Sequence, residues 1–218
     1  PESAETVALA RDLLLVEQTG VRAHFSGLSS ARAMDMLADA QARGLAVSAD
    51  VAMYQLLLCD EDLGDFSSNL HVQPPLRSRH DQQALRSAVQ AGVVQAIASH
   101  HRPHEQEAKR MPFAAAACGI SSVEVLLPLA LTLVADGLLE LPALLARLTH
   151  GPARAFDLPA GQLQTGGSAD ITLFDPAAAS LIGEHWLSRG KNCPFLGQVF
   201  RGLVTHTLCQ GRLVYQKN

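Results

Sequence analysis

The sequence predicts an α/β protein in which strand–helix repeats are followed by a small β domain. In the first part of the chain, short apolar runs alternate with segments whose apolar residues have helical spacing. That order is typical of right-handed βαβ units and a parallel sheet. After Phe156 the pattern changes to short apolar runs separated by glycine-rich turns, which indicates antiparallel strands. We therefore expect two domains, residues 1–155 and 156–218.

The first domain should contain three strands and three helices before its long loop. Each expected helix ends at a glycine, namely Gly20, Gly44 or Gly92, and Ser29 or Ser30 can cap the second one. The expected strands cover residues 21–26, 45–51 and 93–99. The expected helices cover residues 4–18, 29–43 and 81–90.

The rest of the chain carries weaker local signals. Residues 100–119 form a loop long enough to be functional or mobile. Ser121 and Glu124 have the spacing of a capping box for an apolar helix that runs to Val134. Pro142 suits the first turn of a further helix, which should end near residues 150–152. Short strands are expected at residues 161–163, 166–168, 169–176, 204–209 and 212–215.

The composition excludes several classes of partner. The chain has 218 residues, is 48% hydrophobic, is 17% charged and carries a net charge of −4. The charged fraction is below the usual value of about 25%, which indicates that some surface is covered by other protein. No basic block points to nucleic acid or an anionic membrane, and no apolar run suits a bilayer span. The start lacks signal-peptide character, and four widely spaced cysteines suggest reduced thiols of a cytoplasmic protein.

The segment from Ala96 to His104 organises these observations. Its apolar run ends in polar, titratable residues, as expected where a buried parallel strand delivers functional groups at its C-terminal edge. The stretch Ile97-Ala98-Ser99-His100-His101-Arg102-Pro103-His104 resembles the Ile-Ala-Thr-Asp-His-Ala-Pro-His motif of dihydroorotases, which are cyclic amidohydrolases. Similar matches occur at Asp60-Glu61-Asp62-Leu63, at Pro74-Pro75-Leu76-Arg77 and at Gly161…Phe174-Asp175-Pro176.

The resemblance covers almost the whole chain and implies its architecture. It identifies the α/β part as the C-terminal part of an amidohydrolase TIM-type (β/α) barrel, and the tail as part of a small β-sandwich domain. Three βα units cannot close a barrel that needs eight strands and typically about 250 residues. We therefore expect the N-terminal part of the same protein to supply the remainder.

The resemblance also exposes exchanged residues where the family carries its chemistry. That chemistry uses a metal-bound hydroxide and an aspartate that manages its proton. The aspartate position is His100, and one metal-ligating histidine position is Gly27. Two further imidazoles are replaced by Tyr54 and Gln55, and a substrate-contacting asparagine by Gln73. His100 alone could serve as a base. The joint pattern nevertheless predicts no catalytic residue, no metal ligand and no cofactor.

The remaining polar residues of the matched motifs define what we call the relic pocket. Its candidate members are His24, Asn69, Arg77, His100, His101 and His104. His24 is expected to be a hydrogen-bonded core histidine. His100, His101 and His104 have two readings, a new metal site or a solvated loop, and the loop is favoured because Pro103 opposes helix. Glu105, Glu107, Lys109 and Arg110 are expected to form a solvated loop face.

The resemblance implies a function and leaves alternatives. It is closest to non-catalytic dihydroorotase-like subunits that assemble with the catalytic chain of aspartate transcarbamoylase, in a hetero-oligomer of pyrimidine biosynthesis. The first alternative is an active zinc-dependent dihydroorotase, or related cyclic amidohydrolase, with rearranged site residues. The second is a binding module that retains a pocket for a pyrimidine-like ligand. Neither nucleic acid nor a membrane is an expected partner.

Overall fold

A computed structural model describes residues 1–183 and 186–217. The chain forms two compact units. The first contains Pro1–Val123 and Ser188–Pro194, and the second contains Glu124–Leu187 and Phe195–Asn218. The division into domains 1–155 and 156–218 stays a prediction. None of the helices within the described ranges has the length and apolar content required to cross a membrane.

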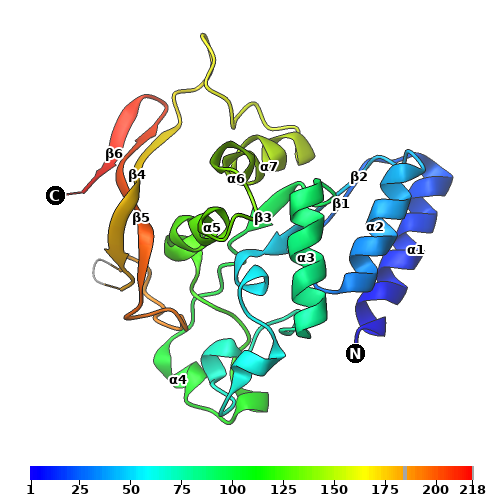
Figure 1. Ribbon diagram of the computed structural model, residues 1–218, viewed down its shortest axis with the longest axis horizontal. Coiled ribbons are helices and arrows are strands. Elements are labelled where there is room, and N and C mark those ends of the chain that lie inside the picture. Colours follow the sequence, from blue (N-terminus) through cyan, green and yellow to red (C-terminus); the bar gives the residue numbers. More distant parts are fainter. Residues whose placement is uncertain (184–185, 218) are drawn as a thin grey trace. The chain divides into compact units, whose positions relative to one another are not determined.

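The first unit is built on a parallel three-stranded sheet (Figure 1). Its strands are β1 (Ala23–Phe25), β2 (Val47–Ala52) and β3 (Ala96–Ala98), in the spatial order β1-β2-β3. Both pairings are parallel, with His24 opposite Ser48 and Val51 opposite Ile97. The expectation of neighbouring parallel strands is therefore confirmed. A further parallel bridge joins His101 to Ile120, so the segment around Ile120 continues the parallel arrangement beyond β3.

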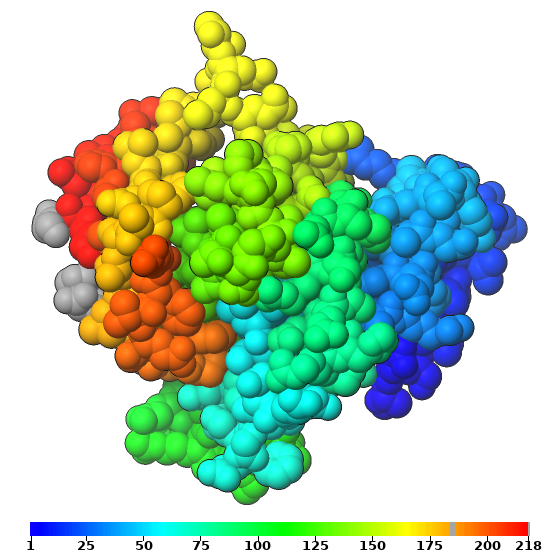
Figure 2. Space-filling view, in the orientation of Figure 1, coloured from blue at the N-terminus to red at the C-terminus, as the bar shows by residue number. Residues whose placement is uncertain are grey.

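Three long helices accompany this sheet, close to their expected positions. They are α1 (Ser3–Thr19), α2 (Ala31–Ala42) and α3 (Arg79–Ala91). The Ser30 side chain caps α2 by accepting the Ala33 N–H, and left-handed Gly20 and Gly92 end α1 and α3. Helix α2 packs against both α1 and α3, and α1 with α2 forms one exposed end of this unit (Figure 2). The capping serine and the C-terminal glycines thus predicted where these helices begin and end.

A partly buried carboxylate holds the start of α2 to α1. Glu5 of α1 accepts hydrogen bonds from the backbone N–H and the hydroxyl of both Ser29 and Ser30. Arg77 lies on the same group, with Nη2 3.6 Å from Glu5 Oε2 and Nε 3.0 Å from Ser29 Oγ. The N-terminus of a helix favours negative charge, so Glu5 acts there as a built-in anion.

The connections of the first unit contain short helical turns. They are η1 (Met53–Leu56), η2 (Asp60–Leu63), η3 (Ser68–Leu70), α4 (Gln106–Lys109) and η4 (Phe113–Ala115). The expected solvated face of the long loop is wrong at Lys109, which is 8% exposed. Its ammonium donates to the carbonyl oxygens of Ser68 and Ala117, at 2.9 and 2.6 Å. These bonds replace water and permit the burial.

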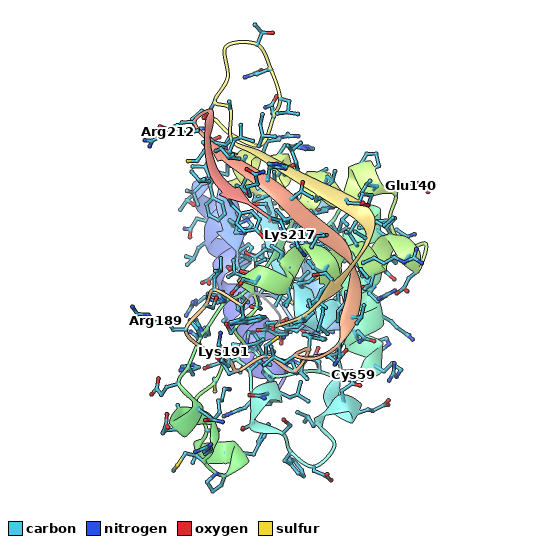
Figure 3. The ribbon with its side chains drawn as sticks, turned by 90° about the vertical axis from the view of Figure 1, so that its left-hand side faces the viewer. Cys59, Glu140, Arg189, Lys191, Arg212 and Lys217 are labelled. Carbon is cyan, nitrogen blue, oxygen red and sulfur yellow. The ribbon has the colours of Figure 1, made fainter. Side chains whose placement is uncertain are left out.

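The second unit consists of three helices and an antiparallel sheet. The helices are α5 (Leu126–Ala135), α6 (Leu141–Leu148) and α7 (His150–Ala155), and the strands are β4 (Ile171–Leu181), β5 (Val199–Cys209) and β6 (Arg212–Gln216). Figure 3 shows the long curved strands, with Arg212 at the start of β6 and Lys217 just after its end. A Cβ on Gly202 would lie 2.3 Å from Leu131 Cδ1. The glycine therefore permits the close packing of α5 on β5.

Three local expectations in this region are wrong. A turn of 3₁₀-helix, η5 (Val123–Val125), precedes α5, so Val125 is the N-cap and Ser121 with Glu124 forms no capping box. The carboxylate of Glu124 instead accepts the N–H of Leu187 at 2.8 Å. The helix expected around Pro142 is α6, which has Pro142 in its first turn and ends at Leu148, close to the expected residues 150–152. Pro152 lies in the first turn of the next helix, α7, where its missing N–H costs nothing. Residues 161–163 and residues 166–168 form no strands.

The Glu5 network yields the first testable prediction. Replacing Glu5 by Ala should lower the free energy of unfolding by about 2–3 kcal/mol, because buried donors of Ser29 and Ser30 lose their acceptor. Urea denaturation of the intact protein measures this. Glu17→Ala is the matched control on the same helix, since Glu17 pairs with Arg43 at an exposed position, 2.8 Å apart, and should cost about 0–1 kcal/mol. Equal losses in both variants would contradict a special role for Glu5.

Candidate functional site

The neighbouring strands β1 and β2 bring together a histidine, a serine and an aspartate. His24 Nδ1 lies 2.8 Å from Ser48 Oγ, and His24 Nε2 lies 3.0 Å from Asp50 Oδ2. The register explains the contact, because Ser48 is opposite His24 and Asp50, two residues further along the strand, shares its face. A carboxylate accepts, so Nε2 carries a proton and donates to Asp50, while Nδ1 shares a hydrogen bond with the Ser48 hydroxyl. The expected hydrogen-bonded core histidine is confirmed.

Asp50 is the most connected group of this site. Its side chain is 8% exposed, and its second oxygen accepts the N–H of Gly27 at 2.9 Å. Burial alone would raise the pKa of Asp50, but hydrogen bonds from His24, Ser26 and Gly27 outweigh it and leave the pKa below its usual range. The ionised carboxylate therefore fixes the turn that follows β1.

Gly27 lies where the family motif has a metal-ligating histidine, and here the ring of His100 lies beside it. A Cβ built on Gly27 would lie 3.0 Å from His100 Nε2 and 3.2 Å from His100 Cε1. Gly27 also has a φ of +71°, a left-handed conformation that side chains rarely adopt. His100 itself has a φ of +51°. The His100 imidazole thus faces the backbone of Gly27.

The other side of the His100 ring meets Tyr54, from the turn after β2. The Tyr54 hydroxyl lies 3.3 Å from His100 Nδ1. Burial raises the pKa of Tyr54 to about 12, against a smaller opposing effect of Arg102, so the hydroxyl stays protonated at neutral pH. The neighbouring Gln55 is buried, and its amide donates to the carbonyl oxygens of Pro74 and Pro75. Both side chains therefore have packing and hydrogen-bonding roles.

The remaining two histidines of the motif bind the backbone of the loop. His101 Nδ1 accepts the N–H groups of Ser122 and Val123, at 3.0 and 3.1 Å. His104 Nε2 lies 3.0 Å from the carbonyl oxygen of Cys118 and, because a carbonyl accepts, donates to it. Both rings are partly buried, whereas the favoured expectation was a solvated loop. Burial is possible because each ring makes hydrogen bonds to the backbone.

Asn192 organises this loop from a distant part of the chain. Its side-chain oxygen accepts the N–H of His104 at 2.8 Å, and its amide donates to the carbonyl oxygens of Arg102 and Gly119. Asn192 is 4% exposed. Sequence reasoning missed it, since it lies 88 residues beyond His104 with no motif around it. Asp50 was also missed, although its alternation with Ser48 on an apolar strand is visible in the sequence.

The structure brings together only some of the relic-pocket candidates. His24 and His100 are linked indirectly: Asp50 binds both His24 and the N–H of Gly27, and the His100 ring lies against Gly27. Arg77 belongs instead to the network of Glu5 and Ser29. Asn69 lies in η3 and makes no hydrogen bond to these histidines within residues 1–183 and 186–217.

The residues present do not fit the metal that the family uses. Gly27 offers no ligand atom, the Tyr54 hydroxyl remains protonated, and the Gln55 amide is bound to carbonyl groups. Over the described part of the chain, no three His, Cys, Asp or Glu side chains are grouped so that they could hold a metal ion. The imidazole nitrogens that zinc prefers are absent from all three positions.

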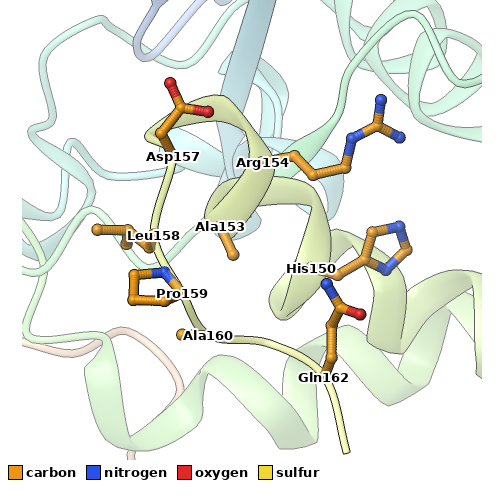
Figure 4. A pocket seen from close by; sticks show the side chains of 8 residues that line it. All are labelled: His150, Ala153, Arg154, Asp157, Leu158, Pro159, Ala160 and Gln162. Atoms are coloured by element: carbon orange, nitrogen blue, oxygen red, sulfur yellow. The ribbon is translucent and has the colours of Figure 1, made fainter. Parts of the chain in front are cut away.

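A separate hollow lies in the second unit, between α7 and the loop that follows it (Figure 4). Its volume is about 270 Å³, and its charged or titratable lining residues are His150, Arg154 and Asp157. A Cβ on Gly161 would lie 2.8–2.9 Å from the backbone of Thr149 and His150, so this glycine lets the loop return close to α7. None of the predicted site residues lines this hollow.

The approach of His100 to Gly27 yields a second prediction. Gly27→Ala should lower the free energy of unfolding by about 1–3 kcal/mol, through left-handed strain and the contact with His100. In a His100→Ala background the loss should shrink by about 0.5 kcal/mol or more. Gly20→Ala is the matched control, because Gly20 has a φ of +68° with nothing within 4 Å. If the loss at Gly27 were the same in both backgrounds, the contact would be without energetic effect.

The Asp50 carboxylate yields a third prediction. Because its pKa is lowered in the folded state, its ionised form stabilises the protein above the ordinary aspartate pKa of about 3.9. That contribution is lost as the pH falls through the folded pKa. The free energy of unfolding should therefore decline below about pH 4, and less steeply in Asp50→Asn. Asp35→Asn, at an exposed position of α2, controls for the removal of one negative charge. Parallel acid profiles of wild type and Asp50→Asn would refute the assignment.

Comparisons with known proteins place this chain in a family. The sequence model of the amidohydrolase family matches residues 1–214. A "Dihydroorotase-like protein" of Pseudomonas aeruginosa is 63% identical over 216 residues, which are 99% of this chain and 51% of that protein. A "Dihydroorotase" of Syntrophus aciditrophicus is 43% identical over 219 residues, 100% of this chain and 51% of that protein. The chain thus spans about half the length of the curated relatives it matches.

Solved structures agree on the fold. The L-hydantoinase of Arthrobacter aurescens superposes with a TM-score of 0.93 at 27% identity, over 100% of this chain and 50% of that one. The inactive dihydroorotase-like domain of a Chaetomium thermophilum CAD-like multifunctional protein shows the same fold, with a TM-score of 0.71 at 24% identity, over 94% of this chain and 54% of that one. The chain therefore belongs to the amidohydrolase family, is dihydroorotase-like, and has the fold of about half of a TIM-type barrel protein.

Proposed function

We propose that this chain is part of a dihydroorotase-like protein that does not hydrolyse dihydroorotate and serves as a structural subunit of aspartate transcarbamoylase. The proposed lack of catalysis rests on one observation, the His100 ring lying against Gly27. At position 27 a glycine replaces the metal-ligating histidine of the family motif. At position 100 a histidine replaces the aspartate that manages the proton, and its ring faces Gly27. Loss of a general base typically costs about 10²–10⁴-fold in rate, and here a ligand is lost with it.

Further support comes from the hydrogen bonds that occupy the neighbouring groups. His24 is bound to Ser48 and Asp50, His101 to two backbone N–H groups, and His104 to a carbonyl oxygen. Such groups hold the ends of parallel strands and the long loop in place. A scaffold in which these side chains stabilise structure is what a subunit selected for assembly requires.

The assembly half rests on the surface and on the family resemblance. Only 17% of the residues are charged. Helix α1 exposes large apolar side chains, among them Val7 at 69%, Leu14 at 65% and Leu15 at 51%. Exposed apolar surface of this kind marks protein–protein contact. We propose two partners for the intact protein, its own N-terminal part and the catalytic chain of aspartate transcarbamoylase, in a hetero-oligomer.

Mixing the two purified, intact proteins tests both halves. Light scattering should report a complex larger than either component, with the transcarbamoylase more active or better assembled inside it. Dihydroorotate hydrolysis should stay at the background rate. A transcarbamoylase of unchanged size and activity would refute the structural role. Hydrolysis at enzymic rates, about 1 s⁻¹ or more, would refute the non-catalytic assignment.

Reversion variants sharpen the second half. His100→Asp should restore no hydrolysis, because Gly27, Tyr54 and Gln55 remain unchanged. His101→Asp is the matched control for placing a carboxylate at a neighbouring motif position. Recovery of hydrolysis by His100→Asp alone would mean that the rest of the site is competent.

A second candidate is an active cyclic amidohydrolase with rearranged site residues and zinc. It is favoured by the 43% identical relative that bears the name "Dihydroorotase". The same hydrolysis assay, with and without added zinc, separates it from the first proposal.

A further inference from the structure

Two loops of the first unit, residues 60–69 and 105–113, lie side by side and present an apolar patch to solvent. They follow the neighbouring parallel strands β2 and β3, so both leave the sheet at the same edge. The ammonium of Lys109 in one loop donates to the carbonyl oxygen of Ser68 in the other, at 2.9 Å. Figure 2 shows the two loops together at its lower end, in cyan and green. What we call the loop patch consists of Phe66, Met111 and Phe113.

Phe66 is the most exposed member of the loop patch. It is 65% exposed, and its φ of +57° is left-handed, which is a genuine outlier for a bulky residue. Backbone strain of this kind costs stability and clusters at binding sites, where it belongs to the function. The Phe66 ring meets the Phe113 ring edge-on, with centroids 5.6 Å apart. Because most of Phe66 remains exposed, burial within this chain does not explain an apolar ring at this strained position.

The support beneath Phe66 is fixed. Phe113 is half-buried, and the centroid of its ring lies 4.7 Å from that of His71. His71 Nδ1 donates to the carbonyl oxygen of Ala116 at 2.8 Å, because a carbonyl oxygen only accepts. Met111, which is 52% exposed, extends the apolar surface from the same loop as Phe113. An anchor that is held in place before binding loses less conformational entropy when a partner covers it.

Acidic side chains surround the loop patch in the sequence of both loops. Residues 60–69 contain four acidic residues and no basic one, and residues 105–113 contain two acidic and two basic residues. Lys109 is buried, which leaves Arg110 as the exposed basic residue of these loops. Such a rim repels phosphate groups and favours a protein surface that carries lysine and arginine. The exposed acidic residues are Asp60, Glu61, Asp62, Asp65, Glu105 and Glu107.

We propose that the loop patch is a docking surface for a protein partner that presents an apolar recess edged by lysine and arginine side chains. The Phe66 ring enters the recess, and the acidic residues of both loops face its cationic edge. Aromatic anchors inside a polar rim are the residues that carry most of the binding energy at protein interfaces. The inference rests on the proposed function for the identity of this partner, so the catalytic chain of aspartate transcarbamoylase is the probe.

The loop patch is separate from the edges at which further strands extend the parallel sheet. Those edges are β1 on one side and the segment around Ile120 on the other. The two loops instead leave the sheet beyond the C-terminal ends of β2 and β3. A partner can therefore cover the loop patch without competing with the strands that complete a barrel.

The experiment measures binding of the transcarbamoylase to the intact protein and to its Phe66→Asn variant by calorimetry. Asparagine accepts a left-handed backbone, so the loop keeps its conformation while the ring is lost. Kd should rise by about tenfold or more, while the urea midpoint of the uncomplexed protein stays the same or increases. Phe156→Asn is the matched control, because Phe156 is a phenylalanine of similar exposure, 57%, in the second unit. It should leave Kd unchanged.

The acidic rim is tested by the rate of association. Asp65→Lys should slow association by about fivefold or more at about 50 mM NaCl, and the difference should fade at about 500 mM, because salt screens exposed charges. Asp35→Lys, at an exposed position of α2, makes the same change of charge away from the loop patch. If both variants slowed association equally, the effect would come from net charge and the rim would have no role.

The outcomes separate this inference from the proposed function. Equal binding by wild type and Phe66→Asn would overturn the docking surface and leave the proposed function standing. Absence of any complex with the wild-type protein would refute the proposed partner, and this surface with it. A marked fall in the urea midpoint of uncomplexed Phe66→Asn would show that the ring packs inside the intact protein, which would also overturn the inference.

Discussion

The Asp50 carboxylate is the interaction on which the first unit depends. One oxygen receives His24 from β1, and the other receives the N–H of Gly27 in the turn that follows. The backbone carbonyl of Asp50 also accepts the N–H of Leu28. A single residue of β2 thereby sets where β1 ends and where the chain turns toward α2. Because Gly27 is held there in a left-handed conformation, the position of the His100 ring follows from it.

The fold could be predicted from sequence where the deciding signals are local. The cap of α2 depends on Ser30 and Ala33, three residues apart, and the end of α3 depends on Gly92 alone. The start of α5 was mispredicted, because Ser121 and Glu124 have capping-box spacing but Glu124 lies inside a 3₁₀ turn, Val123–Val125, that precedes the helix. Spacing indicates which bonds are available, and tertiary packing selects among them.

The site was harder to predict because its partners are distant in sequence. Lys109 reads as a surface residue in a charged loop, yet one of its acceptors, Ser68, is 41 residues away. Asn192 holds the loop around His104 from 88 residues away, and no pattern near it indicates this. His24 was predictable because a single histidine in an apolar strand requires hydrogen bonds, although its partners Ser48 and Asp50 were not named. The chemistry of a residue thus indicated that it requires hydrogen bonds, and only the fold showed which residues provide them.

The close approach of His100 to Gly27 has a consequence for the mutational history of such a chain. Any side chain at position 27 must displace the imidazole and accept a left-handed backbone, so the first step back toward a ligand there carries a stability cost. Under the proposed function, an aspartate at position 100 without a ligand at position 27 restores no activity. Under that function, replacing either residue alone therefore brings no gain in activity, so the exchanges at positions 27 and 100 make each other harder to undo. Under the proposed non-catalytic function, selection acts on the surfaces of the protein and not on the site around Gly27.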